Sequence, residues 1–144
     1  MDQVSQLLEN KGHEVWTIGP DAMVYQALQL MADKDIGALV VLDGNEVVGI
    51  FSERDYARKV VLHGKTSTET PVRQVMSSRV LYVRPDQSVE DCMALMTDKH
   101  IRHLPVVDGG RLVGLISIGD IVKAVISQQD FIITQLENYI TSSR

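Results

Sequence analysis

Four polar residues lie at the two ends of an apolar hairpin, where their side chains can meet a small charged ligand: Arg102, His103, Ser117 and Asp120. Between them run two short apolar segments rich in β-branched residues, 104–107 and 112–116. The turn Asp108-Gly109-Gly110 that separates these segments predicts a β-hairpin. Cationic donors, a hydroxyl and a carboxylate grouped in this way suit a ligand that carries a phosphate, a sugar and a flat base.

The hairpin and its flanking residues repeat an earlier stretch of the chain. A shift of 65 positions places residues 15–55 on residues 80–120 without a gap, and 17 of the 41 aligned residues are identical. A gapless match of this extent indicates an internal duplication. Because a repeat of this size buries little apolar surface alone, we expect the two copies to share one core.

Each copy is predicted to form a strand, a helix, two strands and a second helix. In the first copy we expect these elements at 15–18, 21–33, 39–42, 47–51 and 53–62. In the second copy a strand at 80–83 precedes a helix that Ser88 caps and that ends near 98, followed by the hairpin and a helix from 119 to about 140. The apolar face of this last helix continues beyond Gln129, so we expect it to pack on the other repeat or on another chain.

The segments outside the copies complete a five-part organisation. Residues 1–13 are predicted to carry a helix that Gly12 ends, and 14–63 form the first repeat. The polar linker falls within 64–78, where Thr70 and Pro71 are expected as the N-cap and first residue of a short helix. The second repeat spans 79–127, and 128–144 extend its last helix.

Composition excludes several classes of function. The net charge of −5 argues against binding to nucleic acid or to an anionic membrane, which needs clustered Lys and Arg. Cys92 is the single cysteine, which leaves no intramolecular disulfide and fits a reducing cytoplasm. No apolar run approaches the ~18 residues of a membrane span, and the N-terminus lacks the pattern of a signal peptide. We therefore expect a cytoplasmic protein.

The duplicated unit strongly resembles the CBS domain family, named after cystathionine β-synthase. The resemblance rests on the motif G-h-h-S-x-x-D, in which h is apolar, at the exit of each second hairpin strand. It occurs here as Gly49-Ile-Phe-Ser-Glu-Arg-Asp55 and Gly114-Leu-Ile-Ser-Ile-Gly-Asp120. It implies an α/β fold of two repeats packed by pseudo-twofold symmetry into one tandem module. It also implies that the clefts between the repeats bind adenine nucleotides such as AMP, ADP, ATP or NAD.

The resemblance also implies roles for the hairpin residues. Asp120 would accept hydrogen bonds from the ribose hydroxyls, and Ser117 would donate to a phosphate near the helix start. Arg102 and His103 would clamp that phosphate. The apolar slot for adenine would be formed by Tyr82, Val83, Leu104 and Pro105. The second cleft would be lined by Thr17, Ile18, Ala38, Leu39, Ser52 and Asp55.

The first copy departs from the second at the clamp, because Gly37 and Ala38 stand where the second copy has Arg102 and His103. Arg54 and Arg58, on the helix after the first motif, are candidates to compensate. In the family the phosphate of one cleft is often held by the opposite repeat, so the pairing of clamp and cleft stays open. We expect two inequivalent clefts.

Simpler readings exist for the same residues. Asp55 and Asp120 can be plain helix caps, and Arg102 can belong to a solvated loop. His100 and His103 without a third matched ligand are weak evidence for a metal site. We predict a non-catalytic regulatory module that binds an adenine nucleotide, AMP first, requires no metal, forms a homodimer and acts on a separate protein. The alternatives are a structural module with empty clefts and a small nucleotide-hydrolysing enzyme.

Overall fold

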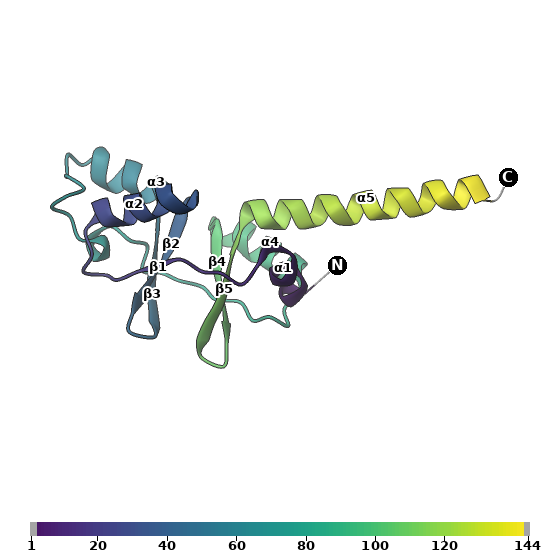
Figure 1. The fold of residues 1–144 in the computed structure, drawn as a ribbon, viewed down its shortest axis with the longest axis horizontal. Helices are drawn as coiled ribbons and strands as arrows, with labels where there is room; N and C mark the ends of the chain where they lie inside the picture. Colours follow the sequence, from purple (N-terminus) through teal and green to yellow (C-terminus); the bar gives the residue numbers. More distant parts are fainter. Residues whose placement is uncertain (1–2, 143–144) are drawn as a thin grey trace.

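Two antiparallel hairpins form the centres of two units that lie side by side (Figure 1). The structure is a computed structural model and describes residues 3–142. The first unit contains β1 (Thr17–Ile18), α2 (Val24–Lys34), β2 (Ala38–Asp43), β3 (Glu46–Ser52) and α3 (Glu53–Asp55). The second contains α4 (Val89–Lys99), β4 (His103–Asp108), β5 (Arg111–Ser117) and α5 (Ile118–Ser142), and α1 (Val4–Lys11) precedes both. The predicted mixed α/β class is confirmed.

The two hairpins have the same register, as the duplication predicts. Ala38 pairs with Ser52 at the base of the first hairpin, and His103 pairs with Ser117 at the base of the second. Each hairpin also has a register shift at the equivalent place, after Val41 in β2 and at the matching position of β4. The base of each hairpin therefore presents a serine at the start of the helix that follows.

Three local expectations differ from the structure. The strand expected at 80–83 is reduced to one parallel bridge between Val83 and Val106. The helix expected at 53–62 is α-helical only in α3 and continues as a π-helix, η1 (Tyr56–Val61). Thr70 is not an N-cap, because its hydroxyl donates to the carbonyl oxygen of Thr66, and a 3₁₀ helix, η2 (Val72–Gln74), starts after Pro71 in extended conformation.

The buried residues form two clusters, one in each unit, rather than the single shared core that we expected. Each cluster is completed by the segment that precedes the other unit. Val4, Leu7 and Leu8 of α1 pack into the second unit, whereas Val72 and Val75 pack into the first. The chain therefore crosses between the units at α1 and at residues 72–77, which we call the crossing segments, and this exchange ties the units together.

The glycine of each G-h-h-S-x-x-D motif makes room for the crossing segment. A Cβ at Gly49 would lie 2.6 Å from the sulfur of Met76, and a Cβ at Gly114 would lie 2.6 Å from Cδ2 of Leu8. Both distances are far below van der Waals contact. The motif glycines are thus explained by close packing rather than by ligand contact.

Helix α5 extends well beyond the second unit (Figure 1). Its first turns pack on that unit, where Ile121 is buried and Ala124 and Val125 are partly buried. Farther along the helix the apolar side chains are exposed, including Ile133 and Leu136. Within residues 3–142, no helix combines the length and apolar character that crossing a bilayer requires.

Candidate functional site

Two clefts lie between the units, and each is built from parts of both. The larger, of about 540 Å³, is lined by Ser52, Arg54, Asp55 and Arg58 of the first unit and by Arg79 and Arg102 of the second. We call it the arginine cleft. Its apolar wall comes from Ile50, Val80, Leu81 and Ile101.

The smaller cleft has a volume of about 350 Å³, and the roles of the two units are exchanged in it. Ser117 and Asp120 come from the second unit, and Trp16, Ile36 and Ala38 come from the first. Lys11, at the end of α1, also lines it, and we call it the lysine cleft. Many of its residues match those of the arginine cleft after the 65-residue shift, so the clefts are pseudo-equivalent.

The carboxylate of each cleft is positioned by a helix cap. Asp55 accepts hydrogen bonds on Oδ2 from the amide and hydroxyl of Ser52, both at 3.0 Å, and its own amide donates back to Ser52 Oγ. Asp120 and Ser117 repeat the backbone part of this arrangement, with Asp120 Oδ2 2.8 Å from the Ser117 amide. The capping reading of the sequence is therefore correct. It leaves ligand binding possible, because a carboxylate accepts about four hydrogen bonds.

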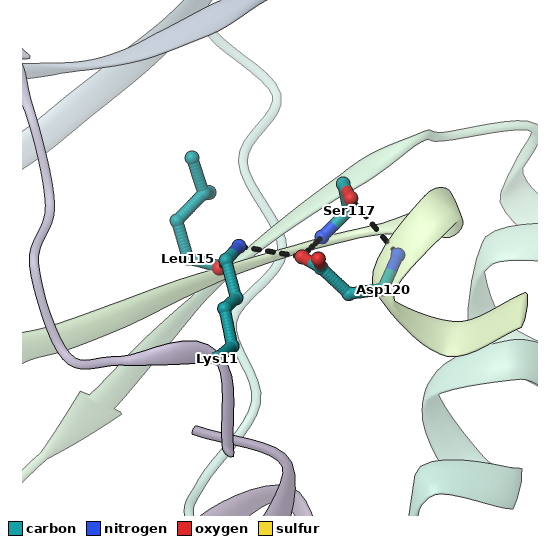
Figure 2. A network of polar contacts seen from close by, with 4 residues as sticks. All are labelled: Lys11, Leu115, Ser117 and Asp120. Atoms are coloured by element: carbon teal, nitrogen blue, oxygen red, sulfur yellow. Dashed lines mark hydrogen bonds and ion pairs between the residues drawn. The ribbon is translucent and has the colours of Figure 1, made fainter. Parts of the chain in front are cut away.

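A lysine from the N-terminal helix reaches the second carboxylate. Figure 2 shows Lys11 pointing at Asp120, with its Nζ 2.5 Å from Oδ2 and hydrogen-bonded to the carbonyl oxygen of Leu115. Burial alone would raise the pKa of Asp120, but the hydrogen bonds from Lys11 and the Ser117 amide outweigh it and hold the pKa below its usual value. In the arginine cleft the corresponding contact to the carboxylate comes from Ser77, whose hydroxyl lies 3.4 Å from Asp55 Oδ1.

The arginine cleft concentrates positive charge. The pKa of Arg54 is lowered, first by the charge of Arg58, then by desolvation and by the charge of Arg102. Lys59 also lies 3.2 Å from Asp55. Guanidinium groups that repel one another beside one carboxylate form a place where an added anion is stabilised.

The lysine cleft lacks this concentration of charge. After the 65-residue shift, Glu14 replaces Arg79 and Gly37 replaces Arg102. Gly119 and Lys123 stand at the positions of Arg54 and Arg58. The two clefts therefore share a backbone frame and a carboxylate but differ in charge.

His103 lies at the boundary and lines both clefts. Its pKa is lowered, mainly by burial and then by the charge of Lys11. It is therefore predominantly neutral at pH 7, and it donates or accepts one hydrogen bond rather than adding a full positive charge. His100 has a left-handed conformation that ends α4 and lies at the rim of the arginine cleft. Among the described residues, no group of three or more His, Cys, Asp or Glu is arranged to hold a metal ion.

The structure groups the residues predicted from the sequence differently from our expectation. Arg102 was assigned to the phosphate next to Ser117, with its pairing to either cleft left open, and it lies in the arginine cleft with Asp55, together with Ser52, Arg54 and Arg58. Ala38, His103, Ser117 and Asp120 lie in the lysine cleft. The reason is the pairing of the units. It brings the residues just before the first strand of each hairpin close to the residues just after the second strand of the other hairpin.

The expected adenine slot does not lie at these clefts. The residues that line neither are Thr17, Ile18, Leu39, Tyr82, Val83, Leu104 and Pro105. Leu39, Val83 and Leu104 are core residues, and Pro105 is buried. Tyr82 is exposed, and its hydroxyl donates to the carbonyl oxygen of Val47 at 3.3 Å. The apolar walls come from residues two positions earlier, Val15–Trp16 and Val80–Leu81.

The cleft residues that sequence reasoning missed include Lys11, Arg79 and Trp16. Lys11 lies outside the duplicated stretch, so no repeat signal identifies it. Arg79 was placed at the start of the second repeat, but the matched stretch begins at residue 80, so the alignment of the copies did not single it out. Trp16 lines the lysine cleft with Lys34 Nζ 4.2 Å from its ring centroid, and as the single tryptophan it could have been singled out.

The fold and the clefts define a class of protein, a duplicated module whose two units exchange segments and enclose two pseudo-equivalent sites. The CBS domain model matches residues 6–62 and 72–127, and the chain belongs to this family, with a tandem pair of CBS domains. Such pairs are regulatory modules.

Known relatives cover nearly the whole chain. A solved structure of a CBS-domain protein from Burkholderia ambifaria is 52% identical, with a TM-score of 0.85, and the match covers 89% of this chain and 96% of that one. The mitochondrial CBS domain-containing protein CBSX3 of Arabidopsis thaliana is 35% identical over 95% of this chain and 71% of its own length. A hexameric CBS-CP12 protein from bloom-forming cyanobacteria is 31% identical, with a TM-score of 0.76, over 84% of this chain and 70% of that one.

Proposed function

We propose that this chain is a regulatory module that binds an adenine nucleotide and that the arginine cleft holds the phosphates. The observation that carries the proposal is the gathering of Arg54, Arg58, Arg79 and Arg102 around Asp55 in one cleft. In a protein of net charge −5, such a cluster is a local exception. Guanidinium groups bind phosphate oxygens through paired hydrogen bonds.

Each part of the nucleotide has a counterpart in the cleft. The carboxylate of Asp55 accepts from the ribose hydroxyls, while Ser52 keeps it in place at the start of α3. The adenine lies against the apolar wall that includes Val80 and Ile101. AMP is the first candidate, and ADP, ATP or NAD would extend further phosphates toward Arg102.

The module does no chemistry on the nucleotide and reports its presence by a change of shape. Because the arginine cleft is built from both units, a ligand that contacts both favours one relative placement of them over others. A ligand shifts such an equilibrium by its difference in affinity for the two placements. The Burkholderia relative has been described as a signal-transduction protein and the cyanobacterial one as hexameric. We propose that this chain acts as a homodimer on a separate cytoplasmic protein.

Thermal denaturation with adenosine, AMP, ADP, ATP and NAD tests the proposal. A ligand at a hundred times its dissociation constant stabilises the folded state by about 2.7 kcal/mol. We expect a rise in melting temperature for the phosphorylated ligands and its loss in Asp55→Asn. Asp120→Asn, in the lysine cleft, is the matched control and should keep the response to AMP. No shift with any of these ligands would refute the proposal, and release of product from ATP or NAD would favour an enzyme.

A further inference from the structure

Much of helix α5 lies away from the body of the protein (Figure 1). Along one side the helix carries a stripe of exposed apolar side chains. We call Val122, Ile126, Ile133 and Leu136 the α5 stripe, and these side chains are between 49% and 57% exposed. With Gln129 included, they follow one another at alternating spacings of four and three residues. This spacing is that of two helices packed side by side as a coiled coil.

The outer part of α5 needs a partner to be stable in water. Isolated helices shorter than about 12–15 residues are marginal even with good helix formers. The segment after Gln129 is of this length and contains Ile132, Ile133 and Thr134, whose β-branched side chains lower helix propensity. Contiguous exposed apolar surface of this kind marks an interaction site.

We propose that the α5 stripe of one chain packs antiparallel against the α5 stripe of a second copy, forming a dimer. In the register that keeps the apolar layers filled, Ile126 lies against the partner's Leu136, and Gln129 lies against the partner's Ile133. Ile132 of the two chains then meet across the twofold axis. The helix pair places the two bodies at opposite ends, so neither body blocks the other.

Charge favours the antiparallel pairing over a parallel one. The only charged residues between Val122 and Thr141 are Lys123, Asp130 and Glu137. Antiparallel pairing brings Lys123 beside the partner's Glu137, twice in each dimer, with Asp130 near the axis. Parallel pairing would instead put Ile132 beside the partner's Glu137 and leave Lys123 without an acidic partner across the interface. The helix dipoles also oppose each other favourably when the helices run in opposite directions.

A membrane surface fits this helix less well than a second copy does. Helices that lie on membranes carry Lys and Arg on the polar side and bind anionic lipid. Along α5 after Val122, Lys123 is followed only by the acidic Asp130 and Glu137 among charged residues. A second copy supplies both an apolar surface of the same length and the matching charges.

Sedimentation equilibrium of the purified chain tests the dimer. We expect the parent protein to be a dimer and Ile133→Asp to be a folded monomer, whose circular dichroism lacks the helical signal of the outer part of α5 because that segment has lost its partner. Phe131→Asp is the matched control, because Phe131 is 63% exposed on the same helix but lines the groove toward α1. It should remain a dimer. A monomeric parent, a dimeric Ile133→Asp or a monomeric Phe131→Asp would overturn the proposal.

The direction of the helices is tested separately by charge reversal and by a distance. Lys123→Glu and Glu137→Lys should each weaken the dimer several-fold, and the double variant should restore it. A spin label on Thr141→Cys should give a distance of about 30 Å along the axis in the antiparallel dimer, against about 10 Å in a parallel one. The native Cys92 does not interfere, because it is buried and burial raises its pKa to about 11. A short label distance, or no rescue by the double variant, would refute the antiparallel arrangement.

Discussion

Replacing Arg102 by alanine should weaken binding more strongly as the number of phosphates on the nucleotide rises. Arg102 lines the arginine cleft and lies close enough to Arg54 to lower the pKa of that guanidinium. Its side chain is exposed, so the phosphate attraction is set by an environment near water. Opposite unit charges 4 Å apart attract by about 1 kcal/mol in water and about 4 kcal/mol near a protein surface.

We take the lower end of this range because exposed ion pairs are screened by solvent and salt. A loss of about 1.4 kcal/mol for the single phosphate of AMP corresponds to about a tenfold weaker affinity. Two further phosphates bring the expected loss for ATP to roughly a hundredfold at low salt, because each adds negative charge that Arg102 no longer offsets. Adenosine should bind the variant and the parent equally.

Isothermal titration with adenosine, AMP and ATP measures these losses, repeated at higher salt. The loss for ATP should shrink as ionic strength rises, since the screening length falls from about 10 Å at 0.1 M to about 3 Å at 1 M. Arg111→Ala is the control, because Arg111 is an exposed arginine at the turn of the second hairpin, outside the arginine cleft. Equal losses for adenosine and ATP, or the same losses in Arg111→Ala, would refute the placement of the phosphates.

Three further outcomes follow from the packing. Lys11→Met should lower the free energy of unfolding at pH 7 by about 1 kcal/mol, a discounted value because Lys11 is 33% exposed. The pKa of Asp120 is lowered in the folded state, so its stabilisation is complete above the unfolded value of about 3.9 and is lost as pH falls through the folded value. Urea denaturation at a series of pH values measures this effect. The free energy of unfolding should fall less steeply at acid pH in Lys11→Met than in the parent protein. Gly114→Ala should lower the free energy of unfolding by about 1–3 kcal/mol because the added methyl clashes with Leu8. In a double-mutant cycle, Gly114→Ala should cost little when Leu8 is already replaced by alanine. Cys92 should resist thiol reagents near pH 8 until the protein unfolds, since burial raises its pKa to about 11.

The parts of the fold that local interactions decide could be predicted from the sequence. Both hairpins follow from apolar runs joined by Gly-containing turns, and Gly109 and Gly110 have the positive φ angles that such a turn requires. The spacing of Ser52 and Asp55 is that of a helix cap, and the structure contains this cap. These features involve residues close together in the chain, so composition and spacing carry the information.

The assembly of the clefts could not be predicted in the same way, because it depends on contacts between distant residues. Arg102 and Asp55 line one cleft only because that cleft is built from both units. Lys11 meets Asp120 because α1 packs into the second unit, 109 residues away in the chain. The expected strand at 80–83 fails for a related reason, since Val80 and Leu81 face the arginine cleft instead of pairing with a neighbouring strand.

The two copies share the residues that the backbone and its packing require, whereas the charged residues of the two clefts differ. Gly49 and Gly114 recur because either Cβ would collide with the crossing segment, and Asp55 and Asp120 recur because each completes a helix cap. The position that matches Arg102 in the first copy completes no helix cap and is occupied by Gly37, so the duplication did not keep a cation there. Under the proposed function, two clefts with one frame and different charges differ in the anionic part of the ligand they accept rather than in the sugar. The charge of the proposed nucleotide, not its adenosine, is then what directs it to the arginine cleft.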